Sequence, residues 1–395
     1  MKRLDYDVVI VGGGPAGLVT SMYIAEKGFS VAVLERDKEI GVPVLCGEGI
    51  SKKVDDLGII DRGRWIENEV VGARIFSPNG TMVKLSAEHA GGETGYIIDR
   101  EIFDKELARL SAKKGTDIFL RCNAKQGIFE NGKMVGVKAD LNGDDVEFFA
   151  KILVGADGVE SRVGRWIGMD TRLKPKDIVS CFEYTLSGIE CNREYSDFYV
   201  GKSLAPGGYI WVFPKSDDVA NVGIGILGSY SKPGLAKELL DRFIESKDEL
   251  KKGKAIRVLT GAVPVAKPIE SLRKNVVLVG DAARHTDPLT GGGIMHALIG
   301  GRIAGETVAE SLESNDISVL TKYEDRWKEI LERKLKRNYM MKEIASTFDD
   351  KTFDMLADSV KDINFDEFST YGLIKALVTK HPSLLIKLKP LLSLR

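Results

Sequence analysis

A glycine-rich turn between two apolar segments is the feature that most restricts how this chain folds. Residues 6–37 read YDVVIVGGGPAGLVTSMYIAEKGFSVAVLERD. The two short apolar runs, each bounded by turn residues, predict buried strands, and the segment between them predicts a helix. A strand, a helix and a second strand of this kind form a βαβ unit. The sequence therefore predicts an α/β fold with a parallel sheet.

The turn itself has the pattern expected of a nucleotide-binding loop. Gly12, Gly14 and Gly17 form G-x-G-x-x-G around Ala16, and Glu35 follows the second strand. The glycines allow a pyrophosphate to approach the helix N-terminus, where free N–H groups and the helix dipole favour an anion. Glu35 can accept hydrogen bonds from a ribose diol and disfavours a 2′-phosphate. We expect a bound dinucleotide; the alternative is a tight strand-to-helix turn without a ligand.

Composition excludes several other classes of protein. The 395 residues have a formal net charge of -1, which gives no general attraction to nucleic acid. The four cysteines form no C-x-x-C pair and have no metal-ligand spacing with the four histidines, so neither a disulfide framework nor a metal site is expected. With no signal-peptide pattern and no apolar run of about 18 residues, we expect a cytoplasmic protein with at most peripheral membrane contact.

The order of predicted elements indicates a discontinuous domain with an insertion. A helix capped by Asp99, a hairpin at the ENGK sequence and a helix over residues 235–246 are predicted. We expect a nucleotide-binding domain from residues 1–73, 98–176 and 264–315, a β-rich substrate domain from residues 74–97 and 177–263, and a helical C-terminal region from residues 316–395.

Two later motifs identify the type of dinucleotide. The sequence VGADGVESRVGRWIG places Asp157 after a buried strand, and VVLVGDAARHTDPLTGGGIMHAL places Asp281 after another, followed by a glycine run that opens a helix. Together with the first motif, this arrangement resembles the flavoproteins whose fold is typified by aromatic hydroxylases. The resemblance covers roughly the first 310 residues and implies a Rossmann-like FAD-binding domain.

This resemblance implies FAD as cofactor and assigns several contacts. Asp281 would bind the ribityl chain, and the helix beginning near Gly293 and Ile294 would direct its positive end to the flavin N1 and O2 region. Arg100 matches a position that reaches the cofactor, and Ala124 matches a backbone contact on the adenine side. The alternative for Arg100 is a surface salt bridge at a helix start.

Three further stretches are more specific than the glycine turn. They are PVLCGEG, which contains Cys46, Gly47 and Gly49, then YIWVFPK at residues 209–215, and NVGIGI from Asn221. These stretches closely resemble the geranylgeranyl reductase family, especially archaeal members that saturate the isoprenoid chains of membrane ether lipids. The resemblance implies that the Cys46 loop approaches the flavin. The alternative for Cys46 is a small buried hydrophobic residue.

Reduction of an isolated double bond requires a proton donor as well as a hydride. The candidates in the sequence are Cys46, Glu48 and Tyr209, with Cys46 placed first because of the family loop; the residues alone do not decide among them. Tyr209, Trp211 and Phe213 alternate along a strand and share one face, which suits the wall of an apolar tunnel. The alternative is a sheet face packed on the core.

We therefore expect an FAD-dependent oxidoreductase that saturates geranylgeranyl chains of a prenylated glycerophospholipid, or free geranylgeranyl diphosphate. The alternatives are a flavin monooxygenase of an apolar or aromatic substrate and a lipid carrier without turnover. No second glycine motif marks a separate nicotinamide domain, so the external electron donor stays open among ferredoxin, reduced flavin and NAD(P)H.

The C-terminal end is basic and rich in leucine. From Tyr371 onward it contains no acidic residue and has five cations, Lys375, Lys380, Lys387, Lys389 and Arg395. Such a segment suits an anionic lipid surface. The alternative is an amphipathic helix packed on the protein itself.

Overall fold

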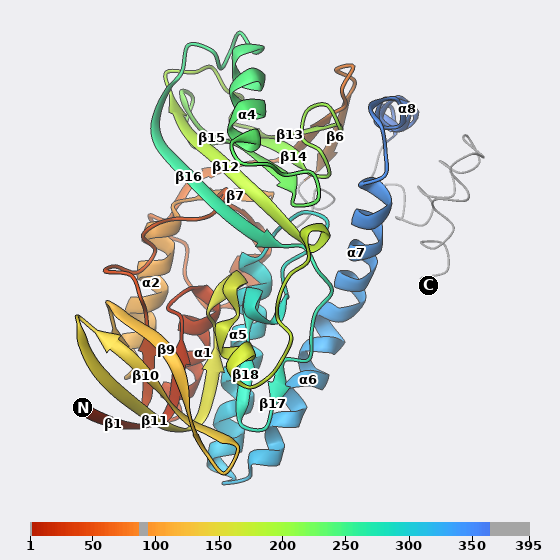
Figure 1. Cartoon of the computed structure of the whole chain (residues 1–395). Helices are drawn as coiled ribbons and strands as arrows, with labels where there is room; N and C mark the ends of the chain where they lie inside the picture. Colours follow the sequence, from red (N-terminus) through yellow and green to blue (C-terminus); the bar gives the residue numbers. More distant parts are fainter. Residues whose placement is uncertain (1, 87–93, 364–395) are drawn as a thin grey trace.

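The structure, a computed structural model, describes residues 2–86 and 94–363. In this part of the chain three sheets carry the architecture (Figure 1). The largest has eight strands, in the order β17-β18-β11-β1-β2-β8, with β10 on β11 and β9 on β10. These strands are β1 (Lys2–Val11), β2 (Val31–Leu34), β8 (Asp117–Phe119), β9 (Cys122–Glu130), β10 (Lys133–Leu141), β11 (Asp144–Gly155), β17 (Leu272–Arg273) and β18 (Val276–Leu278).

The centre of this sheet is parallel, as the βαβ pattern predicts. Strand β1 pairs in parallel with β2 and β11, and β11 pairs in parallel with β18. Helices α1 (Pro15–Ala25) and α5 (Ile294–Glu313) pack closely against each other. Two glycines of α5 permit this approach, because a Cβ on Gly301 would lie 2.7 Å from the Ala16 carbonyl oxygen and one on Gly305 would lie 2.8 Å from that of Thr20. The glycine turn before α1 is therefore held between the sheet and α5.

A second, mostly antiparallel sheet stands above the first domain in Figure 1. Its seven strands follow the order β16-β12-β15-β14-β13-β5-β6. They are β5 (Gly72–Phe76), β6 (Met82–Ser86), β12 (Ile178–Ser187), β13 (Tyr195–Val200), β14 (Tyr209–Pro214), β15 (Val219–Leu227) and β16 (Lys254–Pro264). Helix α4 (Leu235–Glu245) packs on β12 and β15, which leaves the other face of these strands toward the first domain.

A third, small sheet joins the two domains. It has the order β3-β7-β4 and consists of β3 (Gly49–Ser51), β4 (Ile66–Glu69) and β7 (Gly95–Ile98). The sequence predicts that residues 74–97 belong to the β-rich domain, which is only partly what the structure has. Strands β5 and β6 do join the seven-stranded sheet, whereas β7 pairs with β3 and β4, because the chain turns back toward the Cys46 loop before α2 (Arg100–Lys113) begins.

The local predictions are confirmed in detail. Asp99 caps α2 by accepting a hydrogen bond from the Ile102 N–H at 2.9 Å. The ENGK sequence forms the β9–β10 turn, with Asn131 and Gly132 at positive φ. After α5 the described chain is helical and forms α6 (Thr321–Trp327), α7 (Arg333–Ala345) and α8 (Asp350–Val360). The short helix α3 (Arg162–Trp166) lies earlier, after β11. The basic C-terminal segment lies outside the described residues. None of the described helices is long and apolar enough to span a bilayer.

Candidate active site

The three motif glycines of the first turn are required for different reasons. A Cβ on Gly12 would lie 2.3 Å from the Ala156 carbonyl oxygen, and one on Gly17 would lie 2.1 Å from that of Gly12, so packing excludes any side chain there. A Cβ on Gly14 would meet no protein atom within 4 Å, and its φ is an ordinary -79°. The protein itself does not require glycine at this position. The space in front of Gly14 is therefore available for a ligand.

The N-terminus of α1 borders this space. Pro15 occupies the first helical position and has no N–H, while the N–H groups of Ala16 and Gly17 have no partner within the helix because they belong to its first turn. These two donors and the positive end of the helix dipole suit a pyrophosphate. The backbone N–H of Gly13 is already committed to Glu35 Oε2 at 2.7 Å.

Glu35 and Ala124 line the same pocket beside the glycine turn. The Glu35 carboxylate is oriented by the N–H groups of Gly13 and, at 2.9 Å, Asp37, and retains lone pairs for a ribose. Asp157 borders this pocket and accepts a hydrogen bond from the Val163 N–H at 2.9 Å, but its buried Oδ1 has no hydrogen-bond partner among the described residues. Burial raises the pKa of Asp157. A polar ligand here would satisfy that atom.

Asp281 connects the first turn with the second glycine run. The preceding Gly280 has φ +62°, and a Cβ there would lie 2.9 Å from Cβ of Ala16 in the first turn. Asp281 Oδ1 accepts a hydrogen bond from the Thr286 hydroxyl at 2.5 Å and lies 3.3 Å from the Cβ position of Gly293, the N-cap of α5. Burial raises the pKa of Asp281. The carboxyl group is thus placed between the two glycine turns, as an extended dinucleotide requires.

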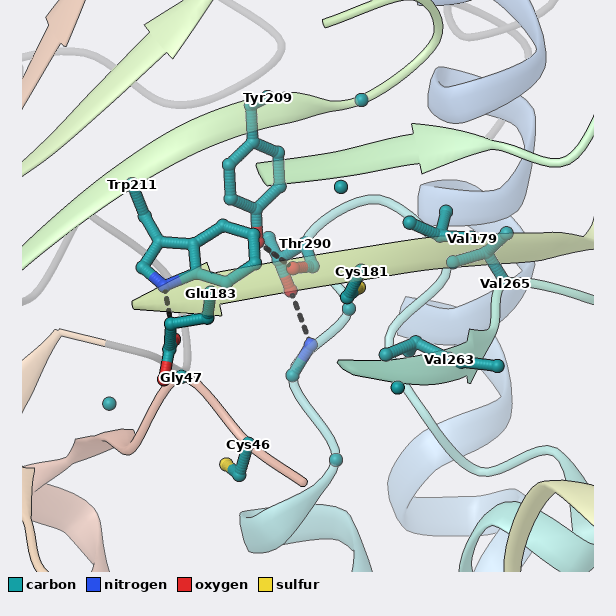
Figure 2. A pocket seen from close by; sticks show the side chains of 18 of the residues that line it. Cys46, Gly47, Val179, Cys181, Glu183, Tyr209, Trp211, Val263, Val265 and Thr290 are labelled. Carbon is teal, nitrogen blue, oxygen red and sulfur yellow. Dashed lines mark hydrogen bonds between the residues drawn. The ribbon is translucent and has the colours of Figure 1, made fainter. Parts of the chain in front are cut away.

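A second pocket begins at the N-terminus of α5 (Figure 2). Residues 45–49 and 288–294 form one end, and side chains from β12, β14 and β16 form the opposite wall. Gly291 has φ +76°, which lets the chain turn into the helix. Most of the lining side chains are apolar. Cys46, Gly47, Gly49, Gly293 and Ile294, all predicted cofactor neighbours, lie together at the end of the pocket formed by the loop and the helix.

Cys46 is a partly buried residue of the loop that lines this pocket. Its Sγ accepts a hydrogen bond from the Glu48 N–H at 3.2 Å. Burial raises the pKa of the Cys46 thiol, although nearby Arg100 opposes this effect. The Arg100 guanidinium forms two hydrogen bonds with the Asp104 carboxylate, at 2.9 and 2.8 Å, and both side chains are largely buried. Arg100 is therefore an internal ion pair beside Cys46 rather than a surface salt bridge.

The Glu48 side chain is fully buried and surrounded by donors. Its Oε1 accepts a hydrogen bond from the Arg100 N–H at 3.0 Å and lies 3.7 Å from the Arg257 guanidinium. Its Oε2 accepts one from the Asn221 amide at 2.7 Å and pairs with Lys215 Nζ at 2.6 Å. Glu48 also has φ +72°, an uncommon conformation for a residue with a side chain. These contacts describe a carboxylate that fixes the shape of the Cys46 loop.

The three alternating aromatic residues of β14 do share one face, and all three line the pocket. Trp211 packs over Gly223 of β15, where a Cβ would come within 2.2 Å of the indole. The Tyr209 hydroxyl donates to the Thr290 carbonyl oxygen, which links β14 to the segment before α5 (Figure 2). Rings of Tyr209 and Trp211 contact edge to face, with centroids 5.9 Å apart, and Phe213 continues the wall.

One acidic residue of the pocket was not found from the sequence. Glu183 lies on β12, and its Oε2 accepts a hydrogen bond from Trp211 Nε1 at 2.8 Å (Figure 2). A signal was present: in IVSCFEYTLS, Val179, Cys181 and Glu183 alternate on one face, so an acid shares a strand face with apolar neighbours.

The residues of both pockets fit FAD. The adenine side has the open glycine turn, Glu35 and an unsatisfied Asp157 oxygen, and the other end has a glycine-lined helix N-terminus beside Cys46. Within the described residues no cluster of His, Cys, Asp and Glu is arranged to hold a metal ion.

Comparison with known proteins agrees with this site. An FAD-binding domain family matches residues 5–187, and the family described as the geranylgeranyl reductase catalytic domain matches residues 177–263. The fold and the site thus define an FAD-dependent oxidoreductase with a Rossmann-like domain, a β-rich domain and a helical C-terminal region, as the sequence predicted.

Relatives extend the match over the whole chain. The digeranylgeranylglycerophospholipid reductase of Methanocella arvoryzae is 41% identical over 98% of this chain and 99% of its own length. Digeranylgeranylglycerophospholipid reductase 1 of Methanococcoides burtonii is 42% identical over 98% of this chain and 95% of its own length. A crystal structure of a geranylgeranyl bacteriochlorophyll reductase-like protein from Thermoplasma acidophilum is 42% identical, with a TM-score of 0.92, covering 98% of this chain and 100% of that chain. The chain belongs to the digeranylgeranylglycerophospholipid reductase family.

Proposed function

We propose that this protein saturates isolated C=C bonds in the geranylgeranyl chains of a digeranylgeranylglycerophospholipid. The observation that carries the proposal is the apolar pocket walled by Tyr209, Trp211 and Phe213, because it ends at the glycine-lined N-terminus of α5 beside Cys46. A prenyl chain in this pocket would present a double bond to the flavin end of the FAD site. FAD supplies a hydride when reduced.

The residues of the chain provide the remaining requirements. The aromatic wall excludes water, and ring faces can stabilise the positive charge that develops on the more substituted alkene carbon. The positive end of α5 favours negative charge on a reduced flavin. Glu48, held by Lys215 and Asn221, keeps the Cys46 loop in its positive-φ conformation.

Another apolar pocket adjoins the pocket at the N-terminus of α5, and the two together support a substrate with two chains. It shares six lining residues with the pocket at the N-terminus of α5, among them Tyr209 and Thr290. Beyond them it is lined mainly by apolar residues, including Phe198, Phe348 and Phe353. We assign the pocket at the N-terminus of α5 to the lipid chain that is being reduced, and the adjoining pocket to the other geranylgeranyl chain of the same lipid. Free geranylgeranyl diphosphate would occupy only one of them.

Access to the lipid and to electrons completes the proposal. The electron donor is external, from the set of ferredoxin, reduced flavin and NAD(P)H. The basic C-terminal segment would hold the protein at an anionic lipid surface. Removal of residues 371–395 would then slow the reduction of bilayer-embedded lipid more than that of detergent-dispersed lipid. An equal decrease of both rates would indicate that the segment packs on the protein instead.

A pocket-blocking variant tests this function. Gly261 of β16 pairs with Cys181, and its Cβ position lies 3.8 Å from Cβ of Leu45 and has no closer neighbour. Gly261→Phe should therefore fill the pocket without disturbing the backbone. We expect FAD binding to persist while the lipid no longer reoxidises dithionite-reduced protein under anaerobic conditions. Val258→Phe, on the exposed face of the same strand, is the matched control and should react normally.

Reoxidation of Gly261→Phe at the wild-type rate would place the lipid elsewhere. Family membership favours reduction over the monooxygenase alternative. Consumption of oxygen with insertion of an oxygen atom into the substrate would instead support that alternative.

A further inference from the structure

Glu183 is a buried acid without an assigned role in this pocket. The residue is 3% exposed and lines the pocket on the same strand face as Cys181. One carboxyl oxygen accepts the hydrogen bond from Trp211 Nε1. The other, Oε1, is buried and has no hydrogen-bond partner among the described residues. Such an atom is costly unless the carboxyl group carries a proton or meets a ligand.

The charges that face Glu183 come from three other elements. Glu48 approaches from the Cys46 loop, Lys215 from the end of β14, and Arg257 from β16. Glu48 already pairs with Lys215 at 2.6 Å and lies 3.7 Å from Arg257. Burial, followed by the negative charge of Glu48, raises the pKa of Glu183 to about 8, against the opposing effects of the Trp211 N–H and the two cations. Burial and the neighbouring Glu48 thus favour the protonated form of Glu183 at neutral pH.

We propose that the Glu183 carboxyl group donates the proton that completes saturation of the prenyl double bond, an inference that rests on the proposed function. One alkene carbon forms a C–H bond with the hydride, and the other forms a C–H bond with the Glu183 proton. The two electrons of the hydride come from reduced flavin, which is oxidised as the double bond becomes a single bond. Glu183 is left as a carboxylate, which the Trp211 N–H, Lys215 and Arg257 stabilise until solvent returns the proton.

The three donors suggested by the sequence fit this role less well. The pKa of Cys46 is raised from an already high value, so the thiol is a weaker acid than Glu183. The Tyr209 hydroxyl already donates a hydrogen bond to the Thr290 carbonyl oxygen. The Glu48 carboxylate accepts from donors on both oxygens. A donor whose pKa lies close to the working pH is also the more efficient catalyst.

Infrared spectroscopy of the oxidised holoprotein tests the protonation state without turnover. Asp157 and Asp281 also have raised pKa values, so carbon-13 labelling of glutamate alone is needed to separate their bands. We expect a band of a protonated glutamate at pH 7 that disappears with a midpoint near pH 8 and is absent from Glu183→Gln. Absence of any titrating glutamate band in the wild-type protein would overturn the proposal, whether or not the variant folds.

Single-turnover reoxidation of dithionite-reduced protein by the lipid tests the chemistry. Glu183→Gln keeps an oxygen that can accept the Trp211 hydrogen bond but has no acidic proton, so the rate should fall about 10²-fold or more at equal flavin content. The wild-type rate should decline above about pH 8, and the variant rate should not. Glu238→Gln, the same chemical change at an exposed position of α4 outside the pocket, is the matched control and should keep the wild-type pH profile.

The outcomes separate this inference from the proposed function. Equal rates and equal pH profiles for the wild type and Glu183→Gln would refute the role of Glu183 and leave lipid reduction intact. If the wild-type protein does not reduce the lipid at all, both fall, even though the infrared band would still report a protonated Glu183.

Discussion

Replacement of Gly14 by valine distinguishes a glycine needed for the cofactor from one needed for the fold. A Cβ at Gly14 meets no protein atom within 4 Å and its backbone is unstrained, so the apoprotein should accept the side chain. Glycine is a moderately good N-cap and valine a poor one, which limits the expected loss to about 1 kcal/mol in the free energy of unfolding. A Cβ at Gly17 would lie 2.1 Å from the Gly12 carbonyl oxygen, so Gly17→Ala should destabilise the fold strongly.

The cost to FAD binding should be much larger. The valine would displace a pyrophosphate from the N–H groups of Ala16 and Gly17, and hydrogen bonds to a charged group contribute about 1.5–3 kcal/mol each. Loss of two such bonds corresponds to about 3–6 kcal/mol, or about 10²–10⁴-fold in Kd. Fluorescence titration of the apoprotein with FAD measures the affinity, and urea unfolding of the same sample measures the fold. Wild-type affinity in a folded Gly14→Val protein would refute the assignment of the turn.

Three other changes have defined outcomes. Cys46→Ser should retain FAD and slow lipid-driven reoxidation by less than Glu183→Gln does, as single-turnover rates would show. An equally large loss of rate would indicate that the Cys46 thiol is the proton donor. Glu48→Gln should weaken the contact with Lys215 and lower the free energy of unfolding in urea by about 1–3 kcal/mol, whereas an unchanged midpoint would contradict its anchoring role. Burial lowers the pKa of His285 to about 3. The unfolded chain then binds one more proton at this site below the ordinary pKa of about 6.5, so the contribution of His285 to stability should fall by about 1.4 kcal/mol per pH unit from there down to about pH 3. The pH dependence of the free energy of unfolding in urea between pH 7 and 5 should differ between the wild type and His285→Gln by this contribution, because His296 and Glu183 titrate in both proteins. Identical pH dependences would show that His285 does not titrate on unfolding.

Much of the first domain could be predicted because its signals are local. The glycine turn, the Asp99 cap and the ENGK hairpin each depend on a few adjacent residues whose backbone requirements are known in advance. The alternation of Tyr209, Trp211 and Phe213 likewise determines that they share a face. Whether that face packed on the core or lined a pocket depended on distant segments. The structure places it against residues 45–49 and 288–294.

The proton donor could not be ranked because its environment is assembled from four parts of the chain. Glu183, Glu48, Lys215 and Arg257 are separated in sequence but close in space, and only their relative positions determine which carboxyl group is paired and which retains a proton. In the sequence Glu48 is a candidate proton donor because it is the acid close to Cys46. Its partners on other segments show it bound by donors, whereas Glu183 lies in a strand with no recognisable motif.

Mass spectrometry of a geranylgeranyl glycerophospholipid is the most direct test of lipid reduction by this protein. The lipid is incubated anaerobically with dithionite-reduced holoprotein, and Gly261→Phe is treated in parallel. Addition of one hydride and one proton raises the mass by about 2 Da for each saturated double bond. We expect a series of such steps with the wild-type protein and none with the blocked variant. Unchanged lipid with the wild-type protein, or a gain of one oxygen when air is admitted, would contradict it.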